Sequence, residues 1–217
     1  MMRFISKEVI FGFFRLLDDS GIEYVLIKNI NNELPSQQKR NKDIDILVHP
    51  KDYRRYKKLL SQNGYYTIWH PHGRANGWGH LYGMEKVTKK KSVHGLEVDA
   101  CAQLCCKSTL GNMWVPLDRS IQSSIWRDRI WDGELRCWRM DDKNLAAYLP
   151  ARCILDKSDF PMEYRYEITK MSGLYGNEEV REKLRHIFFD FTDTLISMIE
   201  NKAYDGIIEA YYSYGDY

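Results

Sequence analysis

The stretch Lys42-Asp43-Ile44-Asp45-Ile46-Leu47-Val48 alternates charged and apolar residues and then ends in three apolar ones. In a β-strand, successive side chains point to opposite faces, so Asp43 and Asp45 project together from one side and the isoleucines from the other. Two carboxylates side by side are costly unless a cation bridges them, and hard oxygen ligands at this spacing suit Mg²⁺. The stretch therefore predicts either a strand that carries a metal site or an edge strand whose two acids are merely solvated.

A second stretch, His94-Gly-Leu-Glu-Val-Asp-Ala-Cys101, has the same alternation. Its apolar residues share one face of a strand, which leaves Glu97 and Asp99 on the other face. If this strand pairs beside the first, one of these acids completes a three-carboxylate site. Such a site holds one or two Mg²⁺ ions between protein and phosphate oxygens during an in-line displacement. Spacing alone does not choose between Glu97 and Asp99.

Hydrophobic periodicity predicts an α+β chain of short strands and helices with a C-terminal helical part. The expected elements are a helix at 6–20, strands at 24–28 and 43–48, a helix from Pro50 to Gly64, three strands between 65 and 100, a strand at 135–140 and helices beyond 141, with one apolar stripe over 178–200. The tract KKKS at 89–92 reads as a hairpin turn, and residues 102–133 as irregular. We expect a catalytic domain at 1–140 and a helical subdomain at 141–217.

The net charge of +2 hides an asymmetry between the two halves of the chain. Residues 1–110 carry 18 basic and 11 acidic side chains, a net +7, whereas residues 111–217 carry 14 and 19, a net −5. The split favours an anionic ligand on the first half, with scattered solvated charge as the alternative. Because no aromatic residues are interleaved with KKKS, we expect no nucleic-acid partner.

The cysteines and the N-terminus predict a reduced, cytoplasmic protein. The five cysteines form no CxxC pair and no zinc-ligand spacing. Charged residues interrupt the apolar N-terminal stretch, and no small-residue cleavage site follows, so we expect no signal peptide. No apolar run approaches the roughly 20 residues that a membrane span requires.

Two further segments are candidates for ligand contacts. The glycine-rich stretch HPHGRANGWGH at 70–80 contains Arg74, whose guanidinium is suited to a phosphate; an ordinary long hairpin connection is the alternative. A zinc site made only of its histidines has no cysteine or acid to complete it. Lys157 stands where the helical part is expected to fold back onto the sheet, either to contact a donor or to form an exposed ion pair.

The order of these motifs resembles the nucleotidyltransferase superfamily, the fold of DNA polymerase beta. Within it, the chain is most similar to the small nucleotidyltransferase-like proteins of bacterial surface-polysaccharide gene clusters. The resemblance covers roughly residues 22–160. It is carried by Tyr24-Val-Leu-Ile-Lys28-Asn29, Leu34-Pro35, the stretch at 42–48 and Leu96-Glu97-Val98-Asp99, and more weakly by Trp138-Arg-Met-Asp-Asp142 and Leu155-Asp156-Lys157.

The resemblance implies a small mixed β-sheet flanked by helices. It also implies that Asp43, Asp45 and Asp99 are catalytic residues and ligands of Mg²⁺, with Mn²⁺ as a substitute. The superfamily usually has a Gly-Ser or Gly-Gly pair after the first strand, and here Lys28-Asn29 occupies that place. Asn tolerates the left-handed backbone that Gly supplies, and Lys28 adds positive charge for the donor phosphates. The departure favours a diphosphate-linked donor, or a site that has lost catalysis.

Three functions follow as hypotheses. The first is an Mg²⁺-dependent transferase that moves a nucleotidyl or phospho-alcohol group from a nucleotide donor to a hydroxyl of a sugar or surface-glycan precursor. The second keeps the fold but is a toxin or resistance enzyme acting on RNA, protein or a drug. The third is a catalytically degenerate nucleotide-binding or scaffold subunit.

Overall fold

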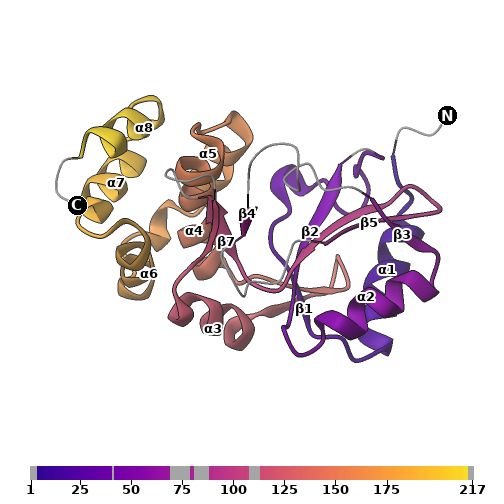
Figure 1. Cartoon of the computed structure of the whole chain (residues 1–217). Coiled ribbons are helices and arrows are strands. Elements are labelled where there is room, and N and C mark those ends of the chain that lie inside the picture. Colours follow the sequence, from indigo (N-terminus) through magenta and orange to yellow (C-terminus); the bar gives the residue numbers. More distant parts are fainter. Residues whose placement is uncertain (1–3, 41, 69–78, 81–87, 108–112, 215–217) are drawn as a thin grey trace.

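The computed structural model of the chain describes residues 4–40, 42–68, 79–80, 88–107 and 113–214 (Figure 1). Within these residues the main sheet has seven strands in the order β3-β5-β6-β2-β1-β10-β9. Their bounds are β1 Tyr24–Leu26, β2 Asp43–Val48, β3 Tyr65–Thr67, β5 Thr88–Ser92, β6 Glu97–Cys101, β9 Ile130–Asp132 and β10 Cys137–Arg139. β2 runs parallel to β6, and β1 to β10, while the other neighbouring pairs are antiparallel.

Helices flank this sheet and continue beyond it. Figure 1 shows α1 and α2 side by side at the N-terminal end of the molecule and α4 to α8 gathered at the other end. The α-helices are α1 Lys7–Asp19, α2 Tyr53–Gln62, α3 Arg119–Asp128, α4 Asp142–Ala151, α5 Met162–Lys170, α6 Glu178–Phe188, α7 Phe191–Glu200 and α8 Tyr204–Ser213. Three short helical segments accompany them, η1 Ile30–Asn32, the π-helix η2 Arg152–Lys157 and η3 Ser172–Leu174. The predicted mixed sheet flanked by helices, with a C-terminal helical part, is confirmed.

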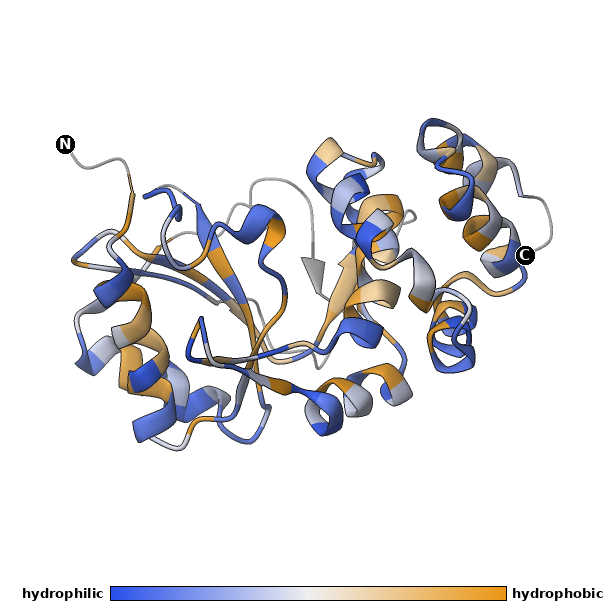
Figure 2. Ribbon diagram, turned by 180° about the vertical axis from the view of Figure 1, so that it is seen from behind, coloured by the Kyte–Doolittle hydropathy of each residue, from blue (hydrophilic) through white to orange (hydrophobic). Residues whose placement is uncertain are grey.

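The first core lies between α1, α2 and one face of the sheet. On β2, Ile44, Ile46 and Val48 are at most 2% exposed and pack in this core. The helices are banded with hydrophobic and hydrophilic residues (Figure 2). On α1 the buried residues fall at the spacing of one helix face. Removal of this apolar surface from water, at about 25 cal/mol per Å², holds the two helices on the sheet.

The second core lies on the opposite face of the sheet, under the C-terminal helices. Val25 and Ile27 join it from the region of β1, and Leu47 joins it from β2. Leu47 is 1% exposed, although it shares its face of the strand with Asp43 and Asp45. The C-terminal helices therefore pack directly on the distal end of this face, and a cavity lies between them and its acidic end.

The KKKS tract is a strand, so the prediction of a turn at 89–92 is wrong. These residues belong to β5, which pairs with both β3 and β6. The chain reverses just after them, where Gly95 adopts a φ of 88° and its N–H donates to the carbonyl of Ser92. Glycine adopts this backbone conformation without steric cost, which places the turn after the lysines.

Two other expectations need correction. Residues 102–133 are not irregular, because they contain α3, β9, β7 Cys105–Lys107 and β8 Met113–Pro116, the last two in a small sheet of order β4-β8-β7 with β4 Gly79–His80. The stripe over 178–200 is divided between α6 and α7, because Phe189 has a φ of 50° and interrupts the helix.

The boundary at residue 140 stays a prediction. Leu104, Ile121 and Ile125 precede it in sequence but pack in the second core together with the C-terminal helices. Within the part of the chain that the structure describes, no helix has both the length and the apolar character needed to cross a membrane.

Candidate functional site

The acidic side chains of β2 and β6 are neighbours on one face of the sheet. In the parallel register of these strands, Asp43 lies beside Glu97 and Asp45 beside Asp99. Partner residues in adjacent strands project to the same side, so this pairing brings four carboxyl groups together. The stretches at 42–48 and 94–101 fold this way because each has apolar residues at alternate positions, and all of these apolar positions are buried in the first core.

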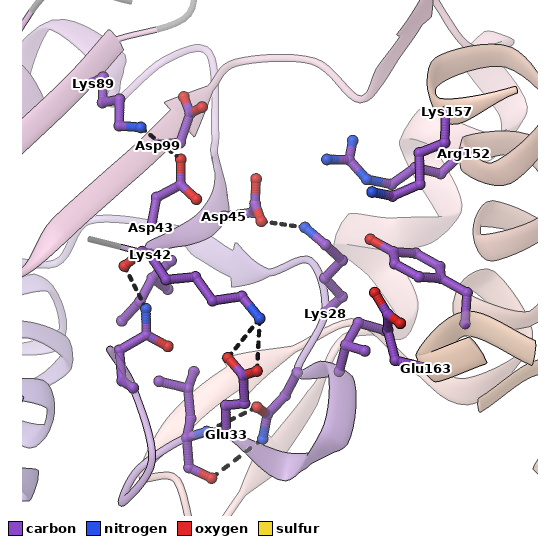
Figure 3. A pocket seen from close by; sticks show the side chains of 16 residues that line it. Lys28, Glu33, Lys42, Asp43, Asp45, Lys89, Asp99, Arg152, Lys157 and Glu163 are labelled. Carbon is purple, nitrogen blue, oxygen red and sulfur yellow. Dashed lines mark hydrogen bonds and ion pairs between the residues drawn. The ribbon is translucent and has the colours of Figure 1, made fainter. Parts of the chain in front are cut away.

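A cavity of about 310 Å³ opens in front of these acids. The predicted residues Lys28, Asn29, Asp43, Asp45, Asp99 and Lys157 all line it, whereas Glu97 does not. Figure 3 shows Asp43, Asp45 and Asp99 on one wall and the helical residues Arg152, Lys157 and Glu163 on the opposite side. The remaining lining residues are Ile30, Glu33, Leu34, Gln38, Lys42, Ile44, Lys89 and Tyr164.

Lysine side chains neutralise the acidic wall. Lys28 contacts Asp45 through an ion pair, and the Lys89 Nζ donates to Asp43 Oδ2 at 2.9 Å (Figure 3). The Lys89 Nζ also lies 3.5 Å from Glu97 Oε2, and Glu97 accepts a hydrogen bond of 2.7 Å from Lys91. The two lysines that contact Asp43 and Asp45 are largely buried, since the side chain of Lys28 is 11% exposed and that of Lys89 is 15% exposed.

The pKa values of these groups reflect burial opposed by their partners. Burial raises the pKa of Asp45, but the attraction of Lys28 and Arg152 outweighs it and holds the pKa below its ordinary value. Burial lowers the pKa of Lys28, and the attraction of Asp45 offsets only part of that change. For Lys89, burial also lowers the pKa, but the hydrogen bond to Asp43 overcomes this and leaves the pKa raised. Asp45 is therefore ionised at neutral pH.

The opposite wall is built from η2 and the start of α5. Asp141 precedes α4, and its side chain caps the N–H groups of Lys143 and Asn144. Pro150 lies next to the end of α4, and η2 follows directly after Ala151. A π-helix is a wider turn that occurs often at functional sites. Here η2 contributes Arg152 and Lys157 to the cavity.

Arg152 is held by neighbours on its own side of the cavity. Its Nη1 donates to Asp156 at 3.0 Å and to the Tyr148 hydroxyl at 3.3 Å. The other carboxylate oxygen of Asp156 accepts the backbone N–H of Lys107 at 2.7 Å, which ties β7 to η2. The Arg152 Nε is buried and makes no hydrogen bond within the described residues. It is therefore a buried donor without a protein acceptor in this part of the chain.

Asn29 closes the loop after β1 with its side chain. Its Oδ1 accepts the Leu34 N–H at 3.0 Å. Its φ is −134°, so the expectation of a left-handed backbone at Asn29 is wrong; Asn31 and Asn32 adopt positive φ instead. The loop turns two residues later than expected because the Asn29 side chain supplies the local hydrogen bond.

Several residues of the cavity were not found by sequence reasoning, among them Lys89, Arg152 and Glu163. Lys89 was assigned to a turn, although the alternation of lysines opposite Glu97 and Asp99 in a hairpin was a usable signal. No local pattern marks Arg152 or Glu163, which come from helices that follow the sheet. Conversely, Arg74, His70 and His72 lie outside the described residues, as does the side chain of His80.

The donor set suits a divalent ion in kind, because three carboxylates face one cavity and oxygen is the ligand that Mg²⁺ prefers. In the arrangement seen here, however, no three His, Cys, Asp or Glu side chains of the described ranges are grouped closely enough to hold an ion. Ammonium groups contact Asp43 and Asp45 instead. Binding of an ion therefore requires that the carboxylates exchange these partners.

All five cysteines are among the described residues and none forms a disulfide. Burial raises the pKa of Cys105 to about 12 and that of Cys106 well above its ordinary value. A protonated thiol is a poor nucleophile, so these cysteines are unsuited to catalysis.

Comparison with known proteins shows a shared fold. No family model and no curated sequence matches the chain. The solution structure of the antibiotic-resistance factor ANT(2″)-Ia matches with a TM-score of 0.50 and 8% identity, over 91% of this chain and 96% of that one. The lincomycin-bound lincosamide antibiotic adenylyltransferase LnuA matches with a TM-score of 0.47 and 12% identity, over 80% and 99% of the two chains.

A crystal structure of ANT(2″)-Ia in complex with adenylyl-2″-tobramycin matches with a TM-score of 0.48 and 7% identity, over 91% of this chain and 98% of that one. At such identities a likeness concerns the fold alone. The match to the solution structure of ANT(2″)-Ia, together with the mixed sheet and its flanking helices, shows a nucleotidyltransferase-like fold.

Proposed function

We propose that the protein is a metal-dependent transferase that moves a nucleotidyl or phospho-alcohol group from a nucleotide donor to a hydroxyl acceptor. The observation that carries this proposal is the arrangement of Asp43, Asp45 and Asp99 on adjacent parallel strands, facing one cavity. Once separated from their lysine partners, three carboxylates on one wall would supply the oxygen ligands of a site that holds Mg²⁺ against phosphate oxygens.

The balanced charge of the cavity supports a donor that binds together with divalent cations. Its described lining contains five basic side chains and five acidic ones, namely Lys28, Lys42, Lys89, Arg152, Lys157, Glu33, Asp43, Asp45, Asp99 and Glu163. A balanced cavity accommodates a nucleotide whose phosphate charges are largely neutralised by bound divalent ions. Mg²⁺ held by Asp43, Asp45 and Asp99 would stabilise negative charge on the phosphate oxygens and make the acceptor hydroxyl easier to deprotonate.

In the proposed reaction, the acceptor hydroxyl oxygen forms a bond to a donor phosphorus, and the bond between that phosphorus and its leaving-group oxygen breaks. Asp99 accepts the hydroxyl proton as general base, and the leaving phosphate or nucleotide carries away the electron pair. Lys28 and Lys157 attract the donor phosphates, and Asn29 holds the loop that positions Lys28. We propose that Arg74, which lies outside the described residues, also attracts the donor phosphates.

The proposed acceptor is a sugar or surface-glycan precursor, because the motifs at 24–29, 42–48 and 96–99 resemble those of proteins from surface-polysaccharide gene clusters. An antibiotic hydroxyl is the second candidate, because the chain shares its fold with the resistance factor ANT(2″)-Ia over 91% of its length. In either case the donor and the free cysteines favour the cytoplasm as the place of action.

A transfer assay with labelled donors tests the proposal. The purified chain is incubated with Mg²⁺, a panel of nucleoside triphosphates and diphosphate-linked donors, and sugar phosphates, tobramycin or lincomycin as acceptors. We expect one donor to bind and one acceptor to be labelled, and we expect Asp45→Asn to lower turnover by about 100-fold or more. Asp19→Asn, the same chemical change at an exposed position of α1, serves as the matched control.

Calorimetry on the same donors adds an independent measurement. Binding in the presence of Mg²⁺ should be lost in the Asp43→Ala/Asp45→Ala variant. The proposal is overturned by silence across the donor panel or by undiminished donor binding in that variant. Metal-dependent binding without transfer to any acceptor would support the degenerate binding subunit instead.

A further inference from the structure

We propose that Lys28 and Lys89 are internal counter-ions that make the binding of the divalent ion and the binding of the donor phosphates depend on each other. This inference rests on the proposed function and adds that the ion and the donor phosphates bind cooperatively. In the protein alone, the lysines neutralise the carboxylates that would hold the ion. When ion and phosphates enter together, the lysines transfer from the carboxylates to the phosphates.

Lys89 is the first of the two proposed counter-ions. In the antiparallel register of β5 and β6, Lys89 lies opposite Asp99, and its ammonium group reaches across to Asp43 at 2.9 Å on the next strand, β2. It thereby spans the three strands at the centre of the acidic wall. Its side chain is 15% exposed, so its charge is poorly solvated and depends on these carboxylates.

Lys28 is the second proposed counter-ion and reaches the acids from the other side of the cavity. It follows β1 and contacts Asp45, the central acid, with 11% of its side chain exposed. Arg152 approaches the same carboxylate from η2 and strengthens its ionised form. Figure 3 shows the side chains of Lys28 and Lys89 directed at the acids from opposite ends of the wall.

The energetic consequence follows from partial burial. A divalent ion that enters alone must separate carboxylates from ammonium groups, which then remain buried without an anion. Donor phosphates remove this cost because each displaced ammonium group finds a phosphate oxygen within the same cavity. The two ligands therefore bind with positive coupling, and by linkage each raises the affinity for the other by the same factor.

Mn²⁺ binding, measured by electron paramagnetic resonance, tests this inference on the intact chain. Mn²⁺ alone should bind the wild type weakly, and inorganic pyrophosphate should tighten it by about tenfold or more, as expected for a typical coupling free energy. Lys28→Met and Lys89→Met should each bind Mn²⁺ alone about tenfold more tightly than the wild type, because a unit positive charge close to the ion is removed. In these variants the gain from pyrophosphate should shrink.

Lys91→Met is the matched control. Lys91 lies on the same strand and carries the same charge, but it contacts Glu97, which is outside the cavity lining, and 31% of its side chain is exposed. Its replacement should change Mn²⁺ affinity by less than about twofold, because an exposed charge is screened by solvent. Thermal unfolding of each variant reports whether it is folded.

Two results would overturn the inference: equal wild-type affinity for Mn²⁺ with and without pyrophosphate, or Mn²⁺ binding in folded Lys28→Met and Lys89→Met that is no tighter than in the wild type. The wild-type comparison remains decisive if a variant does not fold. The measurement needs neither nucleotide nor turnover, so it is independent of the transfer assay. Coupling of Mn²⁺ to pyrophosphate without any transfer would contradict only the proposed reaction. Transfer without this coupling would contradict only the proposed role of the two lysines.

Discussion

Replacement of Asp45 by asparagine should destabilise the protein in the absence of metal, because it leaves the buried Lys28 ammonium group without its counter-ion. The side chain of Lys28 is 11% exposed and that of Asp45 is 25% exposed. Breaking a buried pair costs about 3–5 kcal/mol, whereas an exposed pair contributes about 0.2–1 kcal/mol. This pair lies between the two cases, so we expect a loss of about 2–3 kcal/mol in the free energy of unfolding.

For a chain of this length, each kcal/mol shifts the melting temperature by about 2–4 °C, so Asp45→Asn should melt about 4–12 °C below the wild type. The assay is thermal unfolding near neutral pH with a chelator present, since a bound ion would stabilise the folded state by mass action. Asp19→Asn, at an exposed position, should melt with the wild type.

The double variant Lys28→Met/Asp45→Asn separates the pair from other effects of the substitution. Once both charges are gone, methionine fills the space of the lysine stem without a charge to solvate, and most of the lost stability should return. The reasoning is refuted if Asp45→Asn melts with the wild type, or if the double variant is no more stable than the single one.

Three other predictions concern the core, the acid range and the thiols. Leu47→Ala, at a side chain 1% exposed under the C-terminal helices, should cost about 2–4 kcal/mol in urea unfolding, and a cost below about 1 kcal/mol would contradict its place in the core. Hydrogen bonds from Lys143 and Lys183 lower the pKa of Glu179 to about 2, so its contribution is present above the ordinary carboxyl pKa and is lost as the pH falls toward 2. Glu179→Gln should therefore flatten the acid side of the stability profile, by less than about 1 kcal/mol because Glu179 is 37% exposed; an unchanged profile counts against these bonds. Because burial raises the pKa of Cys105 to about 12, its thiol should react with iodoacetamide at neutral pH at least about tenfold more slowly in the native than in the unfolded chain, and equal rates would show it accessible and ionised.

Much of the sheet could be predicted from local patterns. The alternation in 42–48 and 94–101 located β2 and β6 and separated their acidic from their apolar faces, because the period of two is a property of the extended backbone itself. The same reasoning located α1 and α2, whose apolar residues recur at helical spacing. A break without glycine or proline, such as that at Phe189, leaves no comparable signal.

The candidate site could be predicted only in part. Asp43 and Asp45 were predicted because they alternate with apolar residues, whereas the alternation at 94–101 left Glu97 and Asp99 equivalent and only the family resemblance favoured Asp99. Lys89 was missed because three consecutive lysines read as solvated turn residues until β5 is seen to pair with β6. Its partner Asp43 is 46 residues away in the chain. Such a contact is set by strand order, which the local sequence does not specify.

The sequence by itself therefore determined which faces of the strands are acidic, since side-chain direction follows from backbone geometry and the order of residues. Only the tertiary structure decided what those faces meet: the lysines of β5 and of the loop after β1, and Arg152 from η2 across the cavity. The physical reason is that charge pairing acts over a few ångströms in space and is indifferent to separation along the chain.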